Sequence, residues 1–481
     1  MKVERLKVVR HSQNGQSQLF LPGLVAATTL ILFFSSSLQL WLFREGNDLG
    51  FFDQLVYLVS QGKTPVSTLL PGVHLIGDHG AIILYPLSWL YVIYPDVHWL
   101  LAVQAIALSC GAIPLYFLSR NSGLSVQLAR TVAVTYVLYP AIFNINFFAE
   151  YRPETIAVPA LLWAVLAAKK RAAGQLAIAI MLVLSCKEVL SLTVMGLGIW
   201  LAICQRRLVY GLCCIGVGLG WFIFAATYLI PKFRGGYQMA GTWHYGSLGT
   251  SLTEIAWKVL TKPQILLSRG LASDRLFYYL LLLLPILIGL HWRTILAIVP
   301  ALPMLGLNIL ADSEHQRDLI HQYSLPIIPF LFLWLIASLA YINQHRQRNW
   351  LSRRLLITWC AIAWLALAKY GFFWTRYAAL SSNVGAVRGA IDLVEADDRV
   401  LTSGYISPHL SQRPQLWLLN REITVEQIEQ RDLNTVLIAK QHLGQDISPQ
   451  EVEQLIQDLL NSANFDLVYQ QQDVFLLRKN D

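Results

Sequence analysis

Long apolar runs alternate with short polar connectors between residues 20 and 375, and a mixed polar segment follows as far as residue 481. An apolar run of about 17–25 residues has the length of a helix that crosses a membrane. The first run, 20–43, follows a basic segment, 1–19, and no small-residue cleavage site comes after it. We therefore expect a retained first membrane span with a cytoplasmic N-terminus, 1–19.

The short apolar run 81–94 decides the orientation of the spans that follow. It is interrupted by Pro86, bounded by Pro95 and rich in Tyr and Trp, as is typical of a segment that lies at the membrane surface. If it does not cross, the basic connectors all fall on the cytoplasmic side, as the positive-inside rule requires. These connectors contain Arg120, Arg130, Lys169, Lys170, Arg171, Arg206, Arg207, Arg293, Arg346, Arg348, Arg353 and Arg354. Counting 81–94 as a span would invert all of them.

This orientation predicts about eleven spans in a transmembrane domain, 20–375. An external loop, 44–98, contains juxtamembrane helices. The expected spans are 20–43, 99–118, 130–148, 155–168, 172–186, 189–204, 207–230, 275–290, 294–311, 322–342 and 355–375. The fifth and sixth have roughly 15 residues each, fewer than a full crossing usually needs. For these two, a full and a partial crossing both stay open.

An odd number of spans places the segment 376–481 outside the cytoplasm. This segment contains strand-like runs at 399–402 and 435–438 and an amphipathic stretch at 451–460. Its length of about 105 residues suits one small α/β domain. The predicted fold is therefore mainly α, a polytopic integral membrane protein with a small C-terminal α/β soluble domain.

The composition supports a membrane protein, because 55% of residues are hydrophobic and 14% are charged. The formal net charge of +8 comes from clusters between apolar runs, where cytoplasmic connectors carry them, so we expect no nucleic-acid partner. All six cysteines lie within apolar runs and have no metal-ligand spacing. Neither disulfides nor structural zinc is expected.

Acidic groups gather in the connectors that this topology places outside. Asp48 follows the first span directly, where a carboxylate could act as general base toward an acceptor hydroxyl or bind a divalent ion. It could equally be an N-terminal capping residue of a juxtamembrane helix. Asp53 and Gln54 fit a solvated helix face equally well and are left out of the site.

Two further groups on this side combine acids with His or Lys. Asp78 and His79 lie between two glycines and suit either ligand contact or turn formation. Lys187 and Glu188 link two strongly apolar runs, which indicates either a polar cavity or a local ion pair. Glu154 follows Pro153 and could also be a first-turn acid of the fourth span.

Basic and aromatic side chains of the external loops suit a phosphate and a sugar. Arg152, Lys187 and Arg234 are candidate ligands of a phosphate group. His321 and Tyr323, in a charged loop, are candidate substrate contacts, although aromatic residues there also fit a membrane-interface belt and the loop fits a solvated one. The substrate-binding set is thus Arg152, Lys187, Glu188, Arg234, His321 and Tyr323, and the catalytic set is Asp48, Asp78, His79 and Glu154.

The combination of these motifs resembles a bacterial membrane family known as domain of unknown function 2079. The resemblance rests on Asn47-Asp48-Leu49-Gly50 with Asp53-Gln54, Gly77-Asp78-His79, Pro153-Glu154, Lys187-Glu188, His321-Gln322-Tyr323 with Pro326 and Pro329, and Ser407-Pro408-His409-Leu410-Ser411 with Arg413. It covers most of the chain and implies no activity.

More distantly, the architecture is similar to that of the GT-C type glycosyltransferases, which use polyprenyl-phosphate sugars. In that superfamily an acid of the first external loop is the usual catalytic or metal-binding group, and this role would fall on Asp48. The paired acid of some members is absent here, because Asn47 and Leu49 flank Asp48. We therefore assign no metal ligands and interpret Asp48 as a base, while a divalent cation stays open as a cofactor.

The leading hypothesis is a membrane glycosyltransferase that moves a sugar from a polyprenyl-phosphate carrier to an acceptor at the outer face of the cytoplasmic membrane. Its expected partners are the lipid-linked sugar and membrane lipid, and the sequence implies no oligomeric state. The alternative is a transporter or flippase for a lipid-linked or polar solute. That alternative predicts ionisable residues near the middle of several spans, whereas the charges here lie at the span ends.

Overall fold

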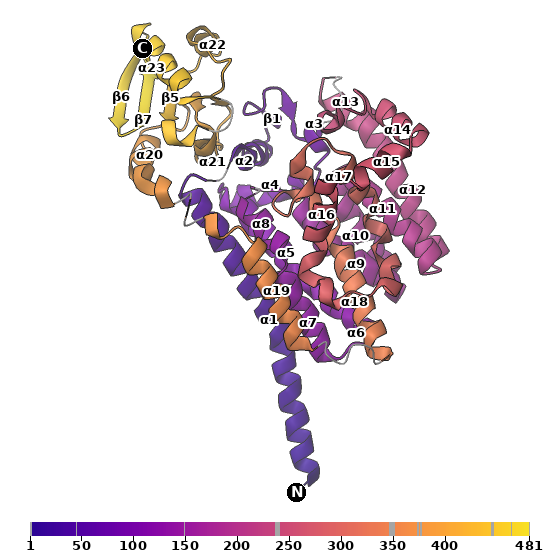
Figure 1. Ribbon diagram of the computed structural model, residues 1–481. Coiled ribbons are helices and arrows are strands. Elements are labelled where there is room, and N and C mark those ends of the chain that lie inside the picture. Colours follow the sequence, from indigo (N-terminus) through magenta and orange to yellow (C-terminus); the bar gives the residue numbers. More distant parts are fainter. Residues whose placement is uncertain are drawn as a thin grey trace.

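The computed structural model describes residues 2–44, 46–148, 150–235, 241–345, 352–372, 375, 378–443, 447–462 and 464–480. The description of side chains covers the same residues except 2–18 and 378–380. A bundle of helices forms most of the molecule, and the N-terminus and a small β-containing domain lie at its opposite ends (Figure 1).

The first half of the chain is helical apart from one short hairpin, formed by β1 (Val66–Ser67) and β2 (Val73–His74). Its helices are α1 (Lys2–Trp41), α2 (Asn47–Ser60), α3 (Leu75–His79), α4 (Leu84–Ile93), α5 (His98–Cys110), α6 (Ala112–Asn121), α7 (Val126–Val137), α8 (Pro140–Phe148), α9 (Glu154–Lys170), α10 (Ala173–Cys186), α11 (Leu190–Ile199) and α12 (Leu208–Phe224).

The second half continues the bundle and then forms the C-terminal sheet domain. Its helices are α13 (Ile230–Phe233), α14 (Leu252–Thr261), α15 (Gln264–Gly270), α16 (Ser273–Leu283), α17 (Leu302–Leu310), α18 (Ile328–Gln344), α19 (Arg353–Leu367), α20 (Val384–Ile391), α21 (Ser407–Leu410), α22 (Val425–Gln430) and α23 (Pro449–Asn461). Its strands are β3 (Val400–Thr402), β4 (Leu416–Leu418), β5 (Thr435–Ala439), β6 (Phe465–Gln471) and β7 (Val474–Lys479). Short 3-10 segments, among them Leu284–Gly289 and Trp292–Ala301, and the π-helical turns Trp200–Cys204 and Ala225–Leu229 join several helices.

Helix α9 runs through the centre of the bundle and is buried along almost its whole length. Alanines make up much of its surface, including Ala157, Ala160, Ala164 and Ala167. Small side chains let neighbouring helices approach closely where the surrounding lipid provides little hydrophobic driving force. Helices α5, α6, α10 and α18 all pack against α9, which therefore holds its first residue, Glu154, in a fixed position.

Each predicted span overlaps a helical segment, and part of the last, 373–374, lies outside the described residues. Within the part of the chain that the structure describes, five segments have the length and composition to cross a membrane: Leu19–Trp41, His98–Asn121, Val126–Phe148, Leu208–Phe233 and Trp292–Leu310. A sixth candidate, Gln264–Gly270 with Ser273–Gly289, is bent by 65°. Helices α10 and α18 have 14 and 17 residues and are shorter than each of the five segments. The number of eleven crossings therefore stays a prediction.

The C-terminal domain contains a five-stranded sheet with the strand order β4-β3-β5-β7-β6. β3 is parallel to β4 and β5, whereas β7 is antiparallel to β5 and β6. Side chains alternate between the two faces, as the strand period requires. Val436 and Ile438 pack with α22 and α23, whereas Leu437 and Ala439 pack toward α20 and α2. The predicted strands and the amphipathic helix are thus confirmed.

Asp53 and Gln54 are not solvated, contrary to the interpretation of this helix face, because both are fully buried between α2 and the C-terminal domain. The hydroxyl of Tyr91 donates to Asp53 at 2.5 Å, and the hydroxyl of Ser411 donates to it at 2.6 Å. Gln54 donates to the carbonyl of Arg413 at 3.2 Å. Two motifs that lie 358 residues apart therefore form one interface.

We expect the docked interface to weaken as the pH rises from about 4 to about 6. Burial raises the pKa of Asp53 to about 6, although the hydrogen bonds from Ser411 and Tyr91 oppose this. The folded state therefore holds the Asp53 proton more tightly than the unfolded state, and stability on the order of 3 kcal/mol is lost on ionisation. Thermal unfolding in detergent between pH 4 and pH 7 should show this slope in the wild type and a flatter one in Asp53→Asn. Equal slopes would contradict the assignment.

Candidate functional site

A cavity of about 760 Å³ lies between the bundle and Tyr405 of the C-terminal domain. All ten residues of the predicted site line it, although they come from segments that are far apart in the sequence. They are Asp48, Asp78, His79, Arg152, Glu154, Lys187, Glu188, Arg234, His321 and Tyr323. The expectation that the outward acids share one pocket agrees with this geometry, whereas the role of each residue stays a prediction.

Asp48 lies in the first turn of α2, where the partial positive charge of the helix N-terminus favours a carboxylate. Its side chain is 40% exposed and forms an ion pair with the guanidinium of Arg152, which is 18% exposed. The expected N-cap position is instead occupied by Gly46, which makes no side-chain cap. The Asp48 carboxylate is therefore held by Arg152 and still faces the cavity.

Glu150 is a site residue that the sequence reasoning did not select, although it lies two residues before Arg152. Its carboxylate accepts the backbone N–H of Leu49 at 3.1 Å. Burial, reinforced by the negative charge of Asp48, raises the pKa of Glu150 to about 8, with Arg152 opposing the rise. Glu150 therefore carries a proton at neutral pH. Its burial depends on Gly46, because a Cβ atom there would overlap the Glu150 carboxylate.

The loop that carries Glu150 and Arg152 is held by Gln104, a fully buried residue of α5. The Gln104 amide donates to the carbonyl of Glu150 at 2.8 Å and accepts the backbone N–H of Arg152 at 2.9 Å. Glu150 has a φ of 59°, a left-handed conformation that costs a non-glycine residue energy and persists where surrounding contacts hold it. Gln104 supplies two of those contacts. In the sequence, the feature that could have pointed to this role is that Gln104 is a polar residue within an apolar run.

A buried ion pair joins α9 to the link between α10 and α11. The ammonium of Lys187 lies 2.8 Å from the Glu154 carboxylate, and the two side chains are 13% and 7% exposed. Burial disfavours the charged lysine, but the nearby charges of Glu154 and Glu188 raise the pKa of Lys187 above its ordinary value. Lys187 is therefore a permanent cation in the cavity wall.

Glu188 and His79 form a second contact across the same loops. The Nδ1 atom of His79 lies 3.4 Å from the carboxylate of Glu188, a side chain that is 2% exposed. The Nε2 atom of His79 lies 3.9 Å from the carboxylate of Asp78. The backbone N–H of Glu188 donates to the carbonyl of His79 at 3.2 Å. Burial lowers the pKa of His79, but the carboxylates of Asp78 and Glu188 outweigh it, so the net shift is upward.

The opposite wall comes from later loops. Arg234 donates to the carbonyl of Gly77 at 3.3 Å, and the hydroxyl of Tyr323 lies 3.2 Å from Nε2 of His244. Burial, together with the charge of Lys187, lowers the pKa of His244 to about 4, so this imidazole is neutral. His244 was noted as part of an aromatic loop but not selected for the site.

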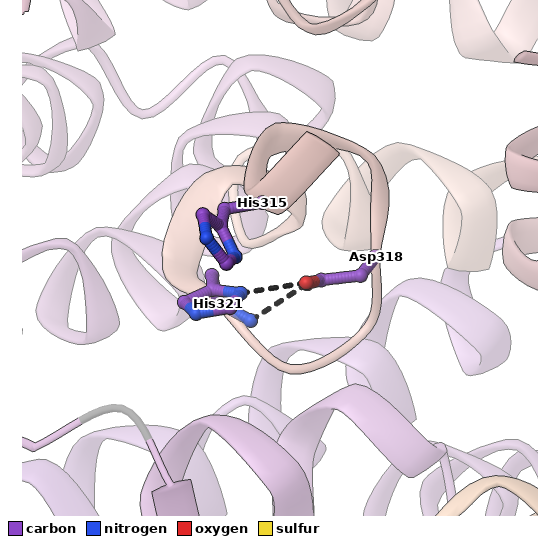
Figure 2. A group of neighbouring side chains, drawn as sticks. All are labelled: His315, Asp318 and His321. Atoms are coloured by element: carbon purple, nitrogen blue, oxygen red, sulfur yellow. Dashed lines mark hydrogen bonds and ion pairs between the residues drawn. The ribbon is translucent and has the colours of Figure 1, made fainter. Parts of the chain in front are cut away.

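One group of side chains in this wall could hold a metal ion. His315, Asp318 and His321 each offer a ligand atom, and these atoms lie within 4.8 Å of one another (Figure 2). Asp48 lies apart from this group in the sequence, and one oxygen of its carboxylate is paired with the guanidinium of Arg152. The site therefore combines paired acids and bases with a separate imidazole-rich group.

Comparisons with known proteins agree with the membrane fold. The family model described as "Predicted membrane protein (DUF2079)" matches residues 39–476. No curated protein sequence matches the chain.

Two solved proteins have similar structures. ArnT from Cupriavidus metallidurans, solved bound to undecaprenyl phosphate, has a TM-score of 0.54 at 11% identity, with 94% of this chain and 97% of that chain covered. The oligosaccharyltransferase of Archaeoglobus fulgidus in the apo form has a TM-score of 0.42 at 12% identity, with 86% of this chain and 69% of that chain covered.

The described helices and the likeness to the ArnT structure define a mainly helical membrane protein with a fold similar to that of ArnT and a small C-terminal sheet. Within that class, the chain belongs to the DUF2079 family.

We expect Lys187→Met to destabilise the protein by about 3–5 kcal/mol, because it leaves the Glu154 charge buried without its partner. The double variant Glu154→Gln/Lys187→Met should recover part of this loss. Thermal unfolding in detergent measures both effects, with Arg421→Met as a matched control in an exposed pair whose partners are 66% and 46% exposed. A Lys187→Met variant as stable as the control would contradict the buried pair.

Proposed function

We propose that this protein transfers a sugar from a polyprenyl-phosphate carrier to an acceptor hydroxyl at the outer face of the cytoplasmic membrane. The observation that carries the proposal is the cavity, which is lined by three cations, Arg152, Lys187 and Arg234, together with the acidic side chains of Asp48, Asp78, Glu150, Glu154 and Glu188. A lipid phosphate needs cations, and the acceptor hydroxyl needs a base beside them. The GT-C-like fold supports the proposal, as does the undecaprenyl phosphate bound to ArnT.

In this mechanism Asp48 takes the proton of the acceptor hydroxyl while the bond between the sugar and the phosphate breaks. Its half-exposed carboxylate faces the cavity, and Arg152 fixes its orientation. Lys187, Arg152 and Arg234 stabilise the charge that develops on the departing phosphate.

The apolar part of the cavity suits the lipid portion of such a carrier. Phe51, Phe52, Val189, Phe222 and Met304 line it beside the charged groups. A ligand with a charged head and a hydrocarbon chain would satisfy both kinds of wall.

The direction of the helices supports an external site. Helix α9 begins at Glu154 in the cavity and ends at Lys170, which at 1.5 Å per residue lies about 25 Å away. At that far end Lys170 lies over the ring of Phe117, and Arg130 lies over Phe20 of α1. If the basic end is cytoplasmic, as the positive-inside rule favours, 1–19 is cytoplasmic and 376–481 is extracytoplasmic.

A transporter is less well supported by the placement of charge. Among the described residues, the buried charged side chains of the bundle are Asp53, Glu154, Glu188 and Arg317, and each lies at or near the cavity end. Between α7 and α18, Tyr136 and Tyr139 lie edge-on to Phe332, and their hydroxyls donate to the backbone carbonyls of Leu108 and Leu282. These polar groups are paired within the protein, whereas a path for a polar solute typically uses ionisable groups.

We expect Asp48→Asn to lower sugar transfer from the lipid carrier by roughly 10²–10⁴-fold, the usual contribution of a general base. The assay follows labelled sugar from polyprenyl-phosphate carriers into acceptor in reconstituted membranes. The matched control, Asp397→Asn, alters an exposed acid of the C-terminal domain and should leave transfer unchanged. Transfer at the wild-type rate by a folded Asp48→Asn protein would remove the proposal.

We also expect binding of a polyprenyl phosphate to weaken as the pH rises through about 8. Below this pH Glu150 is protonated, and above it the ionised carboxylate repels the phosphate. One added charge about 10 Å away changes affinity by approximately tenfold at an effective dielectric constant of about 20. Affinity measured from pH 7 to pH 9 should fall in the wild type and stay level in Glu150→Gln. A parallel fall in both proteins would contradict this role.

A further inference from the structure

His315, Asp318 and His321 belong to one loop between α17 and α18, and two of them, His315 and His321, line the cavity. The imidazole rings of His315 and His321 lie edge to face with centroids 4.7 Å apart. Asp318 points toward the same place from the other side of the loop (Figure 2). Nothing in the proposed sugar transfer uses these three side chains together.

The backbone of the loop orients the Asp318 carboxylate. Its Oδ1 atom accepts the backbone N–H groups of Ile320 and His321, both at 2.8 Å. The other oxygen, Oδ2, lies 2.6 Å from Nδ1 of His321. One carboxylate oxygen is thus fixed by the backbone, and the other faces an imidazole.

The loop is anchored beneath this group, unlike a freely solvated charged loop. Arg317 is 7% exposed and donates to the carbonyl of Ala311 at 2.7 Å and to Asp274 at 3.1 Å. Gln316 is 3% exposed and lies 3.3 Å from the hydroxyl of Tyr245. Supported ligands of this kind are what a metal site requires, because outer contacts hold the donor atoms in place.

Two imidazoles and one carboxylate are donors that suit zinc and similar transition metals, whereas Mg²⁺ and Ca²⁺ prefer oxygen ligands throughout. Two ligands of a tetrahedral zinc ion, each about 2.1 Å from the metal, lie about 3.4 Å apart. The three donor atoms lie within 4.8 Å of one another, which is near this spacing.

We propose that His315, Asp318 and His321 bind one zinc-type divalent ion in the cavity wall, with a fourth position open to the cavity. A phosphate oxygen or a water molecule fits that position. The ion would replace the hydrogen bond between Asp318 and His321. Binding of the ion depends neither on Asp48 nor on sugar transfer.

The test uses the full-length protein in detergent, stripped with a chelator and titrated with Zn²⁺ against a coloured competitor in the absence of carrier lipid. We expect one zinc ion per chain in the wild type. His315→Ala and His321→Ala should each weaken binding by roughly 100-fold or more, since they remove a direct ligand, a loss at least as large as that of an outer contact. Co²⁺ bound in place of zinc should give the strong visible absorption of a tetrahedral site, and this should disappear in both variants.

His345→Ala is the matched control, because His345 is exposed and stacks on Tyr341 outside the cavity. Asp318→Asn serves as a second variant that keeps an Oδ1 acceptor for the loop backbone. Unfolding of the metal-free proteins shows whether each variant is folded. A wild type that binds no zinc, or folded His315→Ala and His321→Ala proteins with wild-type affinity, would overturn the proposal. Loss of binding in His79→Ala alone would place the metal elsewhere.

Discussion

The site depends on the pairing of opposite charges that have been removed from water. Lys187 and Glu154 lie in the bundle wall with little exposure, where either charge alone would be costly. Their contact joins α9 to the α10–α11 link, and the Asp48–Arg152 pair joins α2 to the loop before α9. These two pairs fix three separate parts of the chain around one cavity. The cost of burying charges is met by their mutual attraction, and the result is a rigid polar surface inside an apolar protein.

The apolar bundle makes this arrangement specific. Alanines of α9 allow close helix packing, so that Glu154 occupies one position instead of several. Gln104 holds Glu150 in a left-handed conformation that the loop would not adopt unaided. Asp53 and Gln54 hold α2 against the C-terminal domain, so the helix that carries Asp48 is held at its first turn and near its middle. The C-terminal domain thereby contributes to the geometry of a cavity formed mainly by the bundle.

Much of this architecture follows from the sequence, because apolar runs and charges at their ends reflect local requirements of a membrane helix. The acids and bases at the span ends were identified for that reason, and they line one cavity. Contacts between segments that are distant in the sequence could not be predicted in this way. Asp53 fitted a solvated helix face, and its burial depends on Ser411, 358 residues later. Glu150 lies among charged neighbours, and its raised pKa depends on burial beside Gly46 and on the nearby charge of Asp48, although the hydrogen bond from the Leu49 N–H opposes the rise. The number of membrane crossings could not be predicted from the lengths of the apolar runs either, because the positions of short helices such as α10 also depend on their neighbours.

We propose that the outward acids and cations form one binding site for a lipid phosphate. A cryo-EM structure of the protein in a lipid nanodisc with added polyprenyl phosphate would test this site. We expect phosphate density within hydrogen-bonding distance of Arg152 or Lys187, with the hydrocarbon chain leaving past Phe222 and the cavity on the face opposite to Lys170. Phosphate bound elsewhere, or a cavity that stays empty at saturating lipid, would contradict it.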